Sequence, residues 1–130
     1  MFIISMDYDS TLFEGSFPEL GEPIKEVIDK VKEFQATGLV EVILWTCREG
    51  KSLEEAVQRC KEQGLEFDAI NENAPYELGY MERQKAKGNI FATRKIYADI
   101  YVDDKSPGSI DFFLKIDVQK TCDSFKDRKD

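Results

Sequence analysis

Residues 2–11 read FIISMDYDST, an apolar run followed by two acids with one residue between them. The run Phe2–Met6 is almost continuously apolar, as is typical of a strand buried on both faces of a parallel sheet. Asp7 and Asp9 follow directly after it. If the chain stays extended there, the first and third side chains leave on the same side, so we expect both carboxylates together beyond the strand end.

Segments of strand and helix length alternate along the rest of the chain. The sequence predicts one helix that starts at Pro23 and stops at Gly38, and another that starts in a capping box at Ser52–Glu55 and ends at Gly64. Strands separated by helices favour βαβ units, so we expect an α/β, three-layer Rossmann-like domain with a mainly parallel central sheet. The other expected elements are strands at 40–45, 67–70 and 99–102, a short helix within 71–88 and a last helix at 110–117.

Length and charge narrow the possible functions. The chain has 130 residues, enough for one domain, which we place at residues 1–122, with 123–130 as a frayed charged tail. Its net charge of −8 argues against general binding to nucleic-acid backbones, which needs clustered positive charge. No apolar run approaches the ~20 residues of a membrane span, so no membrane association is expected. The absence of His excludes Ser-His-Asp and Cys-His catalysis and His-ligated metal sites.

The three cysteines, Cys47, Cys60 and Cys122, form no CxxC pair. An odd number of cysteines behind a start without a basic signal-peptide segment favours the reducing cytoplasm as the location. Because no His is available as a base, Cys47 is expected to be a core or near-site thiol rather than a nucleophile.

Polar side chains follow three of the expected strands. Asp7 and Asp9 come after the first strand, Thr46 after the second, and Asp103 and Asp104 after the last. Ligands of parallel α/β sheets bind beyond the carboxyl ends of the strands, so these residues should meet at one edge. Four carboxylates in one place repel each other unless protons or a cation compensate, and Mg²⁺ is the natural cation for hard oxygen ligands.

The run Asp7-Tyr8-Asp9-Ser10-Thr11 resembles motif I (DxDxT) of the haloacid dehalogenase (HAD) superfamily. In the same order, Thr46 resembles motif II and Asp103-Asp104 the acidic motif IV. The chain is most similar to the small phosphatases of this superfamily without a cap domain, including the phosphatase domains of polynucleotide kinase-phosphatases. The segments 12–22 and 71–94 are too short for a large cap domain. Lys95 is the candidate for the motif III lysine, with Lys87 or Lys85 as alternatives.

The resemblance implies a phosphatase that works through an aspartyl-phosphate. Asp7 would attack phosphorus, and Asp9 would protonate the leaving oxygen and then deprotonate the attacking water. Thr46 would hydrogen-bond a phosphoryl oxygen, and Lys95 would offset negative charge. The resemblance further implies that Mg²⁺ is held by Asp7, the backbone carbonyl of Asp9, Asp103 and, directly or through water, Asp104.

Other residues and other functions stay open at this stage. Cys47 and Arg48, next to Thr46, are candidate substrate contacts, with a surface ion pair as the plainer interpretation of Arg48, and Trp45 is expected in the core. Each acid could instead only cap a turn or helix. The phosphorylated substrate can be small or macromolecular, and a homo-oligomer could cover the open site. The alternative function is a non-catalytic domain that binds a phosphate ligand or regulates while it keeps the HAD fold.

Overall fold

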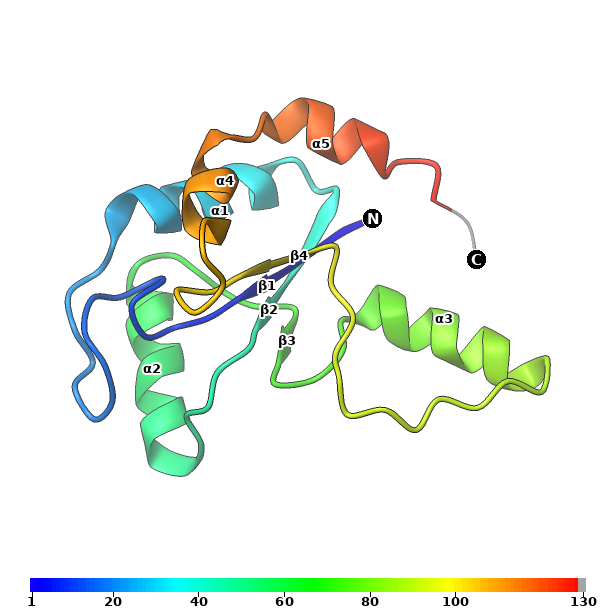
Figure 1. Cartoon of the computed structure of the whole chain (residues 1–130), viewed down its shortest axis with the longest axis horizontal. Coiled ribbons are helices and arrows are strands. Elements are labelled where there is room, and N and C mark those ends of the chain that lie inside the picture. The colour runs from blue at the N-terminus through cyan, green and yellow to red at the C-terminus, as the bar shows by residue number, and fades with distance from the viewer. Residues whose placement is uncertain (129–130) are drawn as a thin grey trace.

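The computed structural model describes residues 1–128 and is built around a four-stranded parallel sheet (Figure 1). The strands are β1 (Phe2–Met6), β2 (Val40–Leu44), β3 (Ala69–Ile70) and β4 (Ile100–Val102), in the order β3-β2-β1-β4. The helices are α1 (Lys25–Ala36), α2 (Gly50–Glu62), α3 (Pro75–Ala86), α4 (Ser109–Lys115) and α5 (Val118–Ser124). The chain is therefore an α/β, three-layer Rossmann-like domain with no large cap domain, as the sequence predicts.

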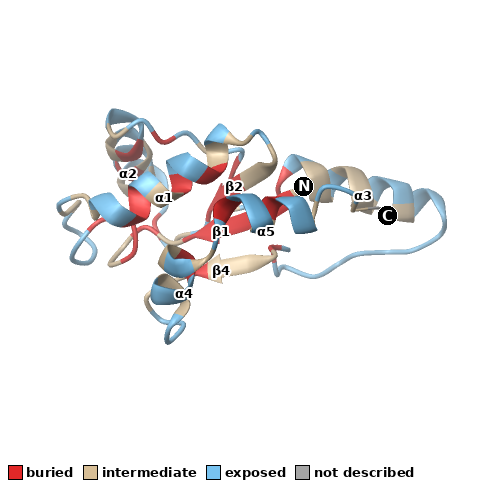
Figure 2. Ribbon diagram, turned by 90° about the horizontal axis from the view of Figure 1, so that it is seen from above, coloured by how far each residue is buried: buried red, intermediate tan, exposed pale blue. Residues whose placement is uncertain are grey.

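The two faces of the sheet are covered unequally. Phe2, Ile4 and Met6 of β1 point to one face, where buried residues of α1, α2, α4 and α5 complete the main core. On the other face, Ile3 packs with a much smaller group of buried residues from β2, β3, the residue before α3 and residues 96–98. No residue of α3 is buried, and Figure 2 shows this helix reaching away from the core. The second outer layer is therefore thin, and part of the sheet face beneath it stays open.

Glu41 explains how α3 is attached to the sheet. This charged residue interrupts the apolar pattern of β2, and its Oε1 accepts a hydrogen bond of 2.8 Å from the backbone N–H of Tyr76 in the first turn of α3. A carboxylate at a helix N-terminus satisfies a free N–H group and complements the helix dipole. The helix has 12 residues, longer than the short helix that the sequence predicts.

The expected starts of two helices are wrong. Pro23 does not open α1; it pairs with Phe13 in an isolated antiparallel bridge, and the helix begins at Lys25. The capping box at Ser52 does not form either, because α2 already begins at Gly50 and the Ser52 hydroxyl accepts a hydrogen bond from Arg48. In both places a contact outside the helix takes up the residue that the local signal assigned to the helix start.

The C-terminal part also differs from the expectation. The helix expected at 110–117 is present as α4, but a further helix, α5, follows it: the Asp117 carboxylate accepts a hydrogen bond from Lys120 N–H and caps the start of α5. Residues 123–128, expected to form a frayed tail, complete α5 and contact the body: Arg128 pairs with Asp99. Residues 129–130 of that expected tail lie outside the described residues.

The expectations for the first two strands are confirmed only in part. The first strand is confirmed in full, whereas the second ends at Leu44 and leaves Trp45 beyond it. Trp45 is 37% exposed, so the expectation of a core tryptophan is wrong. Within residues 1–128, no helix has both the length and the apolar character needed to cross a membrane.

Candidate functional site

The carboxyl ends of β1 and β4, which are neighbours in the sheet, place three carboxylates together. Asp7 follows β1, and Asp103 and Asp104 follow β4. One carboxylate oxygen from each of the three lies within 4.8 Å of the others. The structure therefore brings together three of the four carboxylates that were expected to meet at this edge, although they come from distant parts of the sequence.

The cluster is electrostatically strained without a cation. Burial, together with the neighbouring Asp103 carboxylate, raises the pKa of Asp7 from 3.8 to about 7. Burial disfavours the charged form, and like charges a few ångströms apart disfavour it further. In the absence of a compensating cation, Asp7 is thus only partly ionised near neutral pH.

Two hydroxyl groups hold the loops that carry these acids. Thr11 is fully buried; its hydroxyl donates to Asp7 at 3.3 Å and accepts from the Asp104 backbone N–H at 3.0 Å. The Ser109 hydroxyl donates to the Asp103 carbonyl oxygen at 2.8 Å and accepts from its N–H at 3.1 Å. Neither residue has a role predicted from the sequence, although Thr11 is part of the DxDxT run. No sequence signal marked Ser109.

Asp9 lies apart from this cluster and faces Arg48. The guanidinium donates to both oxygens of the Asp9 carboxylate, through Nε at 3.0 Å and Nη2 at 2.7 Å. Arg48 is only 4% exposed, and it also donates to the Ser52 hydroxyl and to the Glu19 carbonyl oxygen. Its guanidinium carbon lies 4.9 Å from the centroid of the Tyr8 ring. This ion pair is not at the surface: Arg48 is built in as the partner of Asp9.

Thr46 and Cys47 form the turn between Trp45 and Arg48 at the end of β2. The Thr46 hydroxyl accepts from the Arg48 N–H at 3.1 Å, and its own proton stays available for donation. The Thr46 N–H donates to the Asn71 side chain at 2.8 Å, which ties the turn to the end of β3. Cys47 is exposed and lines a cavity of about 380 Å³ together with Asp9 and Arg48.

The three lysine candidates occupy different places. Lys95 lines a cavity of about 340 Å³ together with Asp7 and Asp103, and its ammonium lies 5.6 Å from the centroid of the Tyr101 ring. Lys85 lies in the last turn of α3 and Lys87 is its C-terminal cap. Neither Lys85 nor Lys87 lines the cavity that contains Asp7. Of the three, Lys95 is the one that shares a cavity with the acids.

Comparison with known proteins adds one relative. A solved structure of a conserved protein from Bacteroides thetaiotaomicron is 32% identical to this chain, with a TM-score of 0.66, and the match covers 98% of this chain and 92% of the other. The chain belongs to the same family as that protein. No protein-family model and no curated protein matches the chain. The relative is described only as conserved, so it supports the fold and assigns no activity.

Proposed function

We propose that this chain is a Mg²⁺-dependent phosphatase of the HAD type without a cap domain, which hydrolyses phosphate monoesters through an aspartyl-phosphate on Asp7. The observation that carries the proposal is the cluster of Asp7, Asp103 and Asp104, whose oxygens lie within 4.8 Å of one another although the residues stand at opposite ends of the sequence. Three carboxylates without a cation would be unfavourable, so a cation and an anionic substrate are the natural complement.

The residues of the cluster fit Mg²⁺. They offer only hard oxygen donors, the ligands that Mg²⁺ prefers, and these oxygens lie within 4.8 Å of one another. Asp7 and Asp103 would hold the ion, with Asp104 directly or through water; the proposed contribution of the Asp9 backbone carbonyl stays part of the same hypothesis. A bound Mg²⁺ neutralises charge on the phosphate and on the attacking carboxylate.

Each side chain of the site has its own role in the proposed reaction. The Asp7 oxygen would form a bond to phosphorus while the bond from phosphorus to the ester oxygen breaks. Asp9, whose two oxygens accept from Arg48 in the structure, would have to bind a proton and turn toward the cluster to give that ester oxygen its proton. Asp9 then removes a proton from the water that hydrolyses the aspartyl-phosphate. Thr46 donates its free hydroxyl proton to a phosphoryl oxygen, and Lys95 supplies positive charge beside Asp7. Arg48 positions Asp9 in this proposal. Arg48 and Cys47 also remain candidate substrate contacts.

The cellular location, the class of substrate and the oligomeric state belong to the same proposal. Three free cysteines, of which Cys60 and Cys122 are buried, agree with a reducing cytoplasm. The substrate is a phosphorylated compound. A second copy of the chain would cover the open site. Analytical ultracentrifugation with and without substrate tests whether such a dimer forms. The competing function is a non-catalytic domain that binds a phosphate ligand.

The decisive experiment measures phosphate release from a panel of phosphate monoesters with Mg²⁺ and with a chelator. We expect turnover only with Mg²⁺ and a loss of at least about a thousandfold in kcat for Asp7→Asn. Asp103→Asn should weaken Mg²⁺ binding, measured by calorimetry, more than it affects folding. Phosphate binding without any turnover would favour the non-catalytic domain, and full activity of Asp7→Asn would overturn the mechanism.

A further inference from the structure

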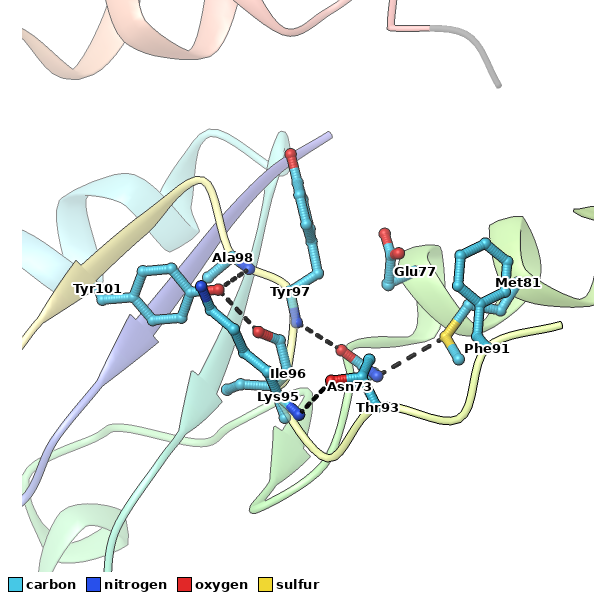
Figure 3. A pocket seen from close by; sticks show the side chains of 10 residues that line it. All are labelled: Asn73, Glu77, Met81, Phe91, Thr93, Lys95, Ile96, Tyr97, Ala98 and Tyr101. Atoms are coloured by element: carbon cyan, nitrogen blue, oxygen red, sulfur yellow. Dashed lines mark hydrogen bonds between the residues drawn. The ribbon is translucent and has the colours of Figure 1, made fainter.

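A cavity of about 410 Å³ lies between α3 and the chain segment 91–98, on the thinly covered face of the sheet (Figure 3). Met81 and Phe91 line it on the side of α3, and Ile96 and Tyr101 line it on the side of the sheet. A volume of this size lies within the range of small-molecule sites and far below that needed for a macromolecule.

This cavity adjoins the acidic site. The cavity that Asp7 and Asp103 line also contains Lys95, Ile96 and Tyr101, and the same three residues line the cavity beside α3. A small ligand with a phosphate at the acids therefore has space to continue past Lys95 toward α3. We rest the following inference on the phosphatase proposed above.

The polar groups of the cavity wall are already occupied by the protein. The Tyr101 hydroxyl donates to the Ile96 carbonyl oxygen at 2.7 Å and accepts from the Ala98 N–H at 3.1 Å. The Asn73 side chain accepts from the Tyr97 N–H at 2.7 Å and donates to the Met81 sulfur at 3.7 Å. These bonds fix the wall before any ligand arrives, which reduces the ordering cost of binding.

Two charged groups of the wall accept or donate no hydrogen bond within residues 1–128, although the Arg128 guanidinium interacts electrostatically with one of them, Glu77. The Lys95 ammonium, at the junction of the two cavities, contacts the Tyr101 ring and has no ion-pair partner within residues 1–128. The Glu77 carboxylate, on α3, has no hydrogen-bond partner within the same described residues, and burial raises the pKa of its carboxyl group. A ligand that suits both groups is anionic near Lys95 and carries a hydrogen-bond donor toward Glu77.

We propose that the cavity beside α3 binds the planar, amino-bearing ring of a small phosphate monoester of nucleotide size, with its phosphate on the side of Lys95. The flat ring contacts Phe91 and Met81 on one side and the wall formed by Ile96 and Tyr101 on the other. Aromatic side chains stack on any flat ring, whereas the amino group supplies the selectivity by donating to Glu77.

Steady-state kinetics with Mg²⁺ tests the role of the ring. We compare AMP and CMP with glycerol 3-phosphate and glucose 6-phosphate, which carry no planar ring. Phe91→Ala should raise KM about tenfold for AMP and CMP and less than about twofold for the two ring-free esters. Phe91 is 43% exposed, so the variant should fold. The control is Phe112→Ala, another exposed phenylalanine that lines neither cavity.

Paired substrates test the amino group. AMP and IMP differ in an amino group against a carbonyl oxygen, and so do CMP and UMP. Wild type should have KM values about tenfold lower for the amino member of at least one pair, and Glu77→Ala should bring that ratio close to one. Glu33→Ala, an exposed position on α1, is the control. Equal KM values within both pairs would overturn the inference, as would a higher kcat/KM for a 3′-phosphorylated oligonucleotide than for every mononucleotide.

A binding measurement separates this inference from the phosphatase itself. Adenosine carries no phosphate, so its binding, followed by NMR, does not depend on Asp7. If no ester is hydrolysed but adenosine binds wild type and not Phe91→Ala, the phosphatase fails and the ring site stands. If esters are hydrolysed but Phe91→Ala changes no KM, the ring site fails and the phosphatase stands.

Discussion

Arg48 and Asp9 form the most strongly built side-chain contact near the candidate site. The guanidinium uses two of its nitrogens on Asp9 and is itself almost fully buried. Such a pair fixes the position of a carboxylate, and removal of one partner leaves the other charge poorly solvated. If Arg48 only bound substrate, its removal would leave the free energy of unfolding unchanged.

Arg48→Gln is therefore expected to lower the free energy of unfolding by about 2 kcal/mol and to lower kcat by at least about tenfold, with a smaller change in KM. Urea unfolding and steady-state kinetics measure the two effects. Lys105→Gln is the stability control, because Lys105 is 89% exposed in its 3.6 Å contact with Asp104 and should contribute less than about 0.5 kcal/mol. A large rise in KM with unchanged stability would instead make Arg48 a substrate contact.

The raised pKa of Asp7 makes a prediction about pH. The folded pKa of about 7 lies above the ordinary value of 3.8, so the native state binds more protons than the unfolded state between these limits. Without metal, the contribution of Asp7 therefore makes stability fall as pH rises from about 4 to 7. The proposed Mg²⁺ would bind the ionised carboxylates, so added Mg²⁺ should raise Tm more at pH 8 than at pH 5.

Differential scanning fluorimetry of wild type and Asp7→Asn, each with EDTA and with Mg²⁺, measures this effect. The Asn variant cannot titrate at this position, so it should lose part of the pH dependence seen in EDTA. If Mg²⁺ raised Tm equally at both pH values in wild type, the link between Asp7 ionisation and metal binding would be wrong.

The residue scale also shows what the sequence could and could not predict. Asp7, Asp103 and Asp104 could be placed together, because parallel strands end at the same edge of the sheet. The partner of Asp9 could not be predicted, since it depends on how the loop after β1 lies against the start of α2. Thr11 was missed for a related reason, since its hydroxyl joins two loops that are distant in sequence, whereas the Ser109 hydroxyl bonds only to Asp103, six residues away.

At the scale of elements, the loop after β1 depends on one glycine. Gly21 has φ +73°, and a Cβ there would lie 1.8 Å from the Glu14 carbonyl oxygen. Glu14 N–H donates to the Glu22 carbonyl oxygen at 2.8 Å, so the two sides of the loop are held in close contact. Gly15 has a similar φ of +87° but open space around its Cβ position.

Gly21→Ala should therefore destabilise the protein by at least about 2 kcal/mol, and Gly15→Ala by about 1 kcal/mol, because only the first adds a backbone clash to the cost of a left-handed conformation. Chemical unfolding of the two variants gives the difference. Since the loop carries Glu19, whose carbonyl oxygen receives a bond from Arg48, Gly21→Ala should also lower kcat. Equal stabilities of the two variants would show that the loop relaxes freely.

The segment after α3 decides which lysine serves the site. Lys95 shares a cavity with Asp7, whereas Lys85 and Lys87 lie at the end of α3. Lys95→Ala is expected to lower kcat by about a hundredfold, and Lys87→Ala and Lys85→Ala to change it by less than about threefold. Phosphate-release assays of the three variants compare them directly. An inactive Lys87→Ala with an active Lys95→Ala would move the role to Lys87 and leave the other residues in place.

Element boundaries show where local sequence signals lose to tertiary contacts. β1 was predicted exactly because a continuous apolar run has few alternatives in a buried sheet. Pro23 and the Ser52 capping box are good local helix starts, yet Pro23 pairs with Phe13 and the Ser52 hydroxyl accepts from Arg48, which is itself held by Asp9. The additional helix α5 was missed because its N-cap, Asp117, was assigned to the end of the preceding helix.

At the scale of the whole molecule, the two ends of the described chain meet at the amino ends of the strands, whereas the acids lie at the carboxyl ends. The Met1 ammonium donates to the Phe125 carbonyl oxygen at 2.9 Å, and the rings of Phe2 and Phe125 lie 4.9 Å apart. Asp99, just before β4, accepts from the Ile3 N–H at 2.8 Å through one oxygen and pairs with Arg128 through the other. The segment after α5 therefore holds the starts of β1 and β4, while the carboxyl ends of the same strands carry the candidate site.

This division between the two ends of the strands predicts a variant that loses stability without losing chemistry. The Asp99 side chain is only 5% exposed, so Arg128→Ala leaves a largely buried carboxylate without its cation and should lower the free energy of unfolding by about 2 kcal/mol. Lys126→Ala, which removes only an exposed contact with Asp123, is the matched control and should leave unfolding unchanged. Below its Tm, Arg128→Ala should keep the wild-type kcat and Mg²⁺ affinity, because Asp7 and Asp103 lie at the other ends of the strands that Asp99 holds. A loss of kcat at full occupancy of the folded state would mean that the strand starts and the acidic site are coupled through β1 and β4, and that the parallel sheet transmits strain along its strands.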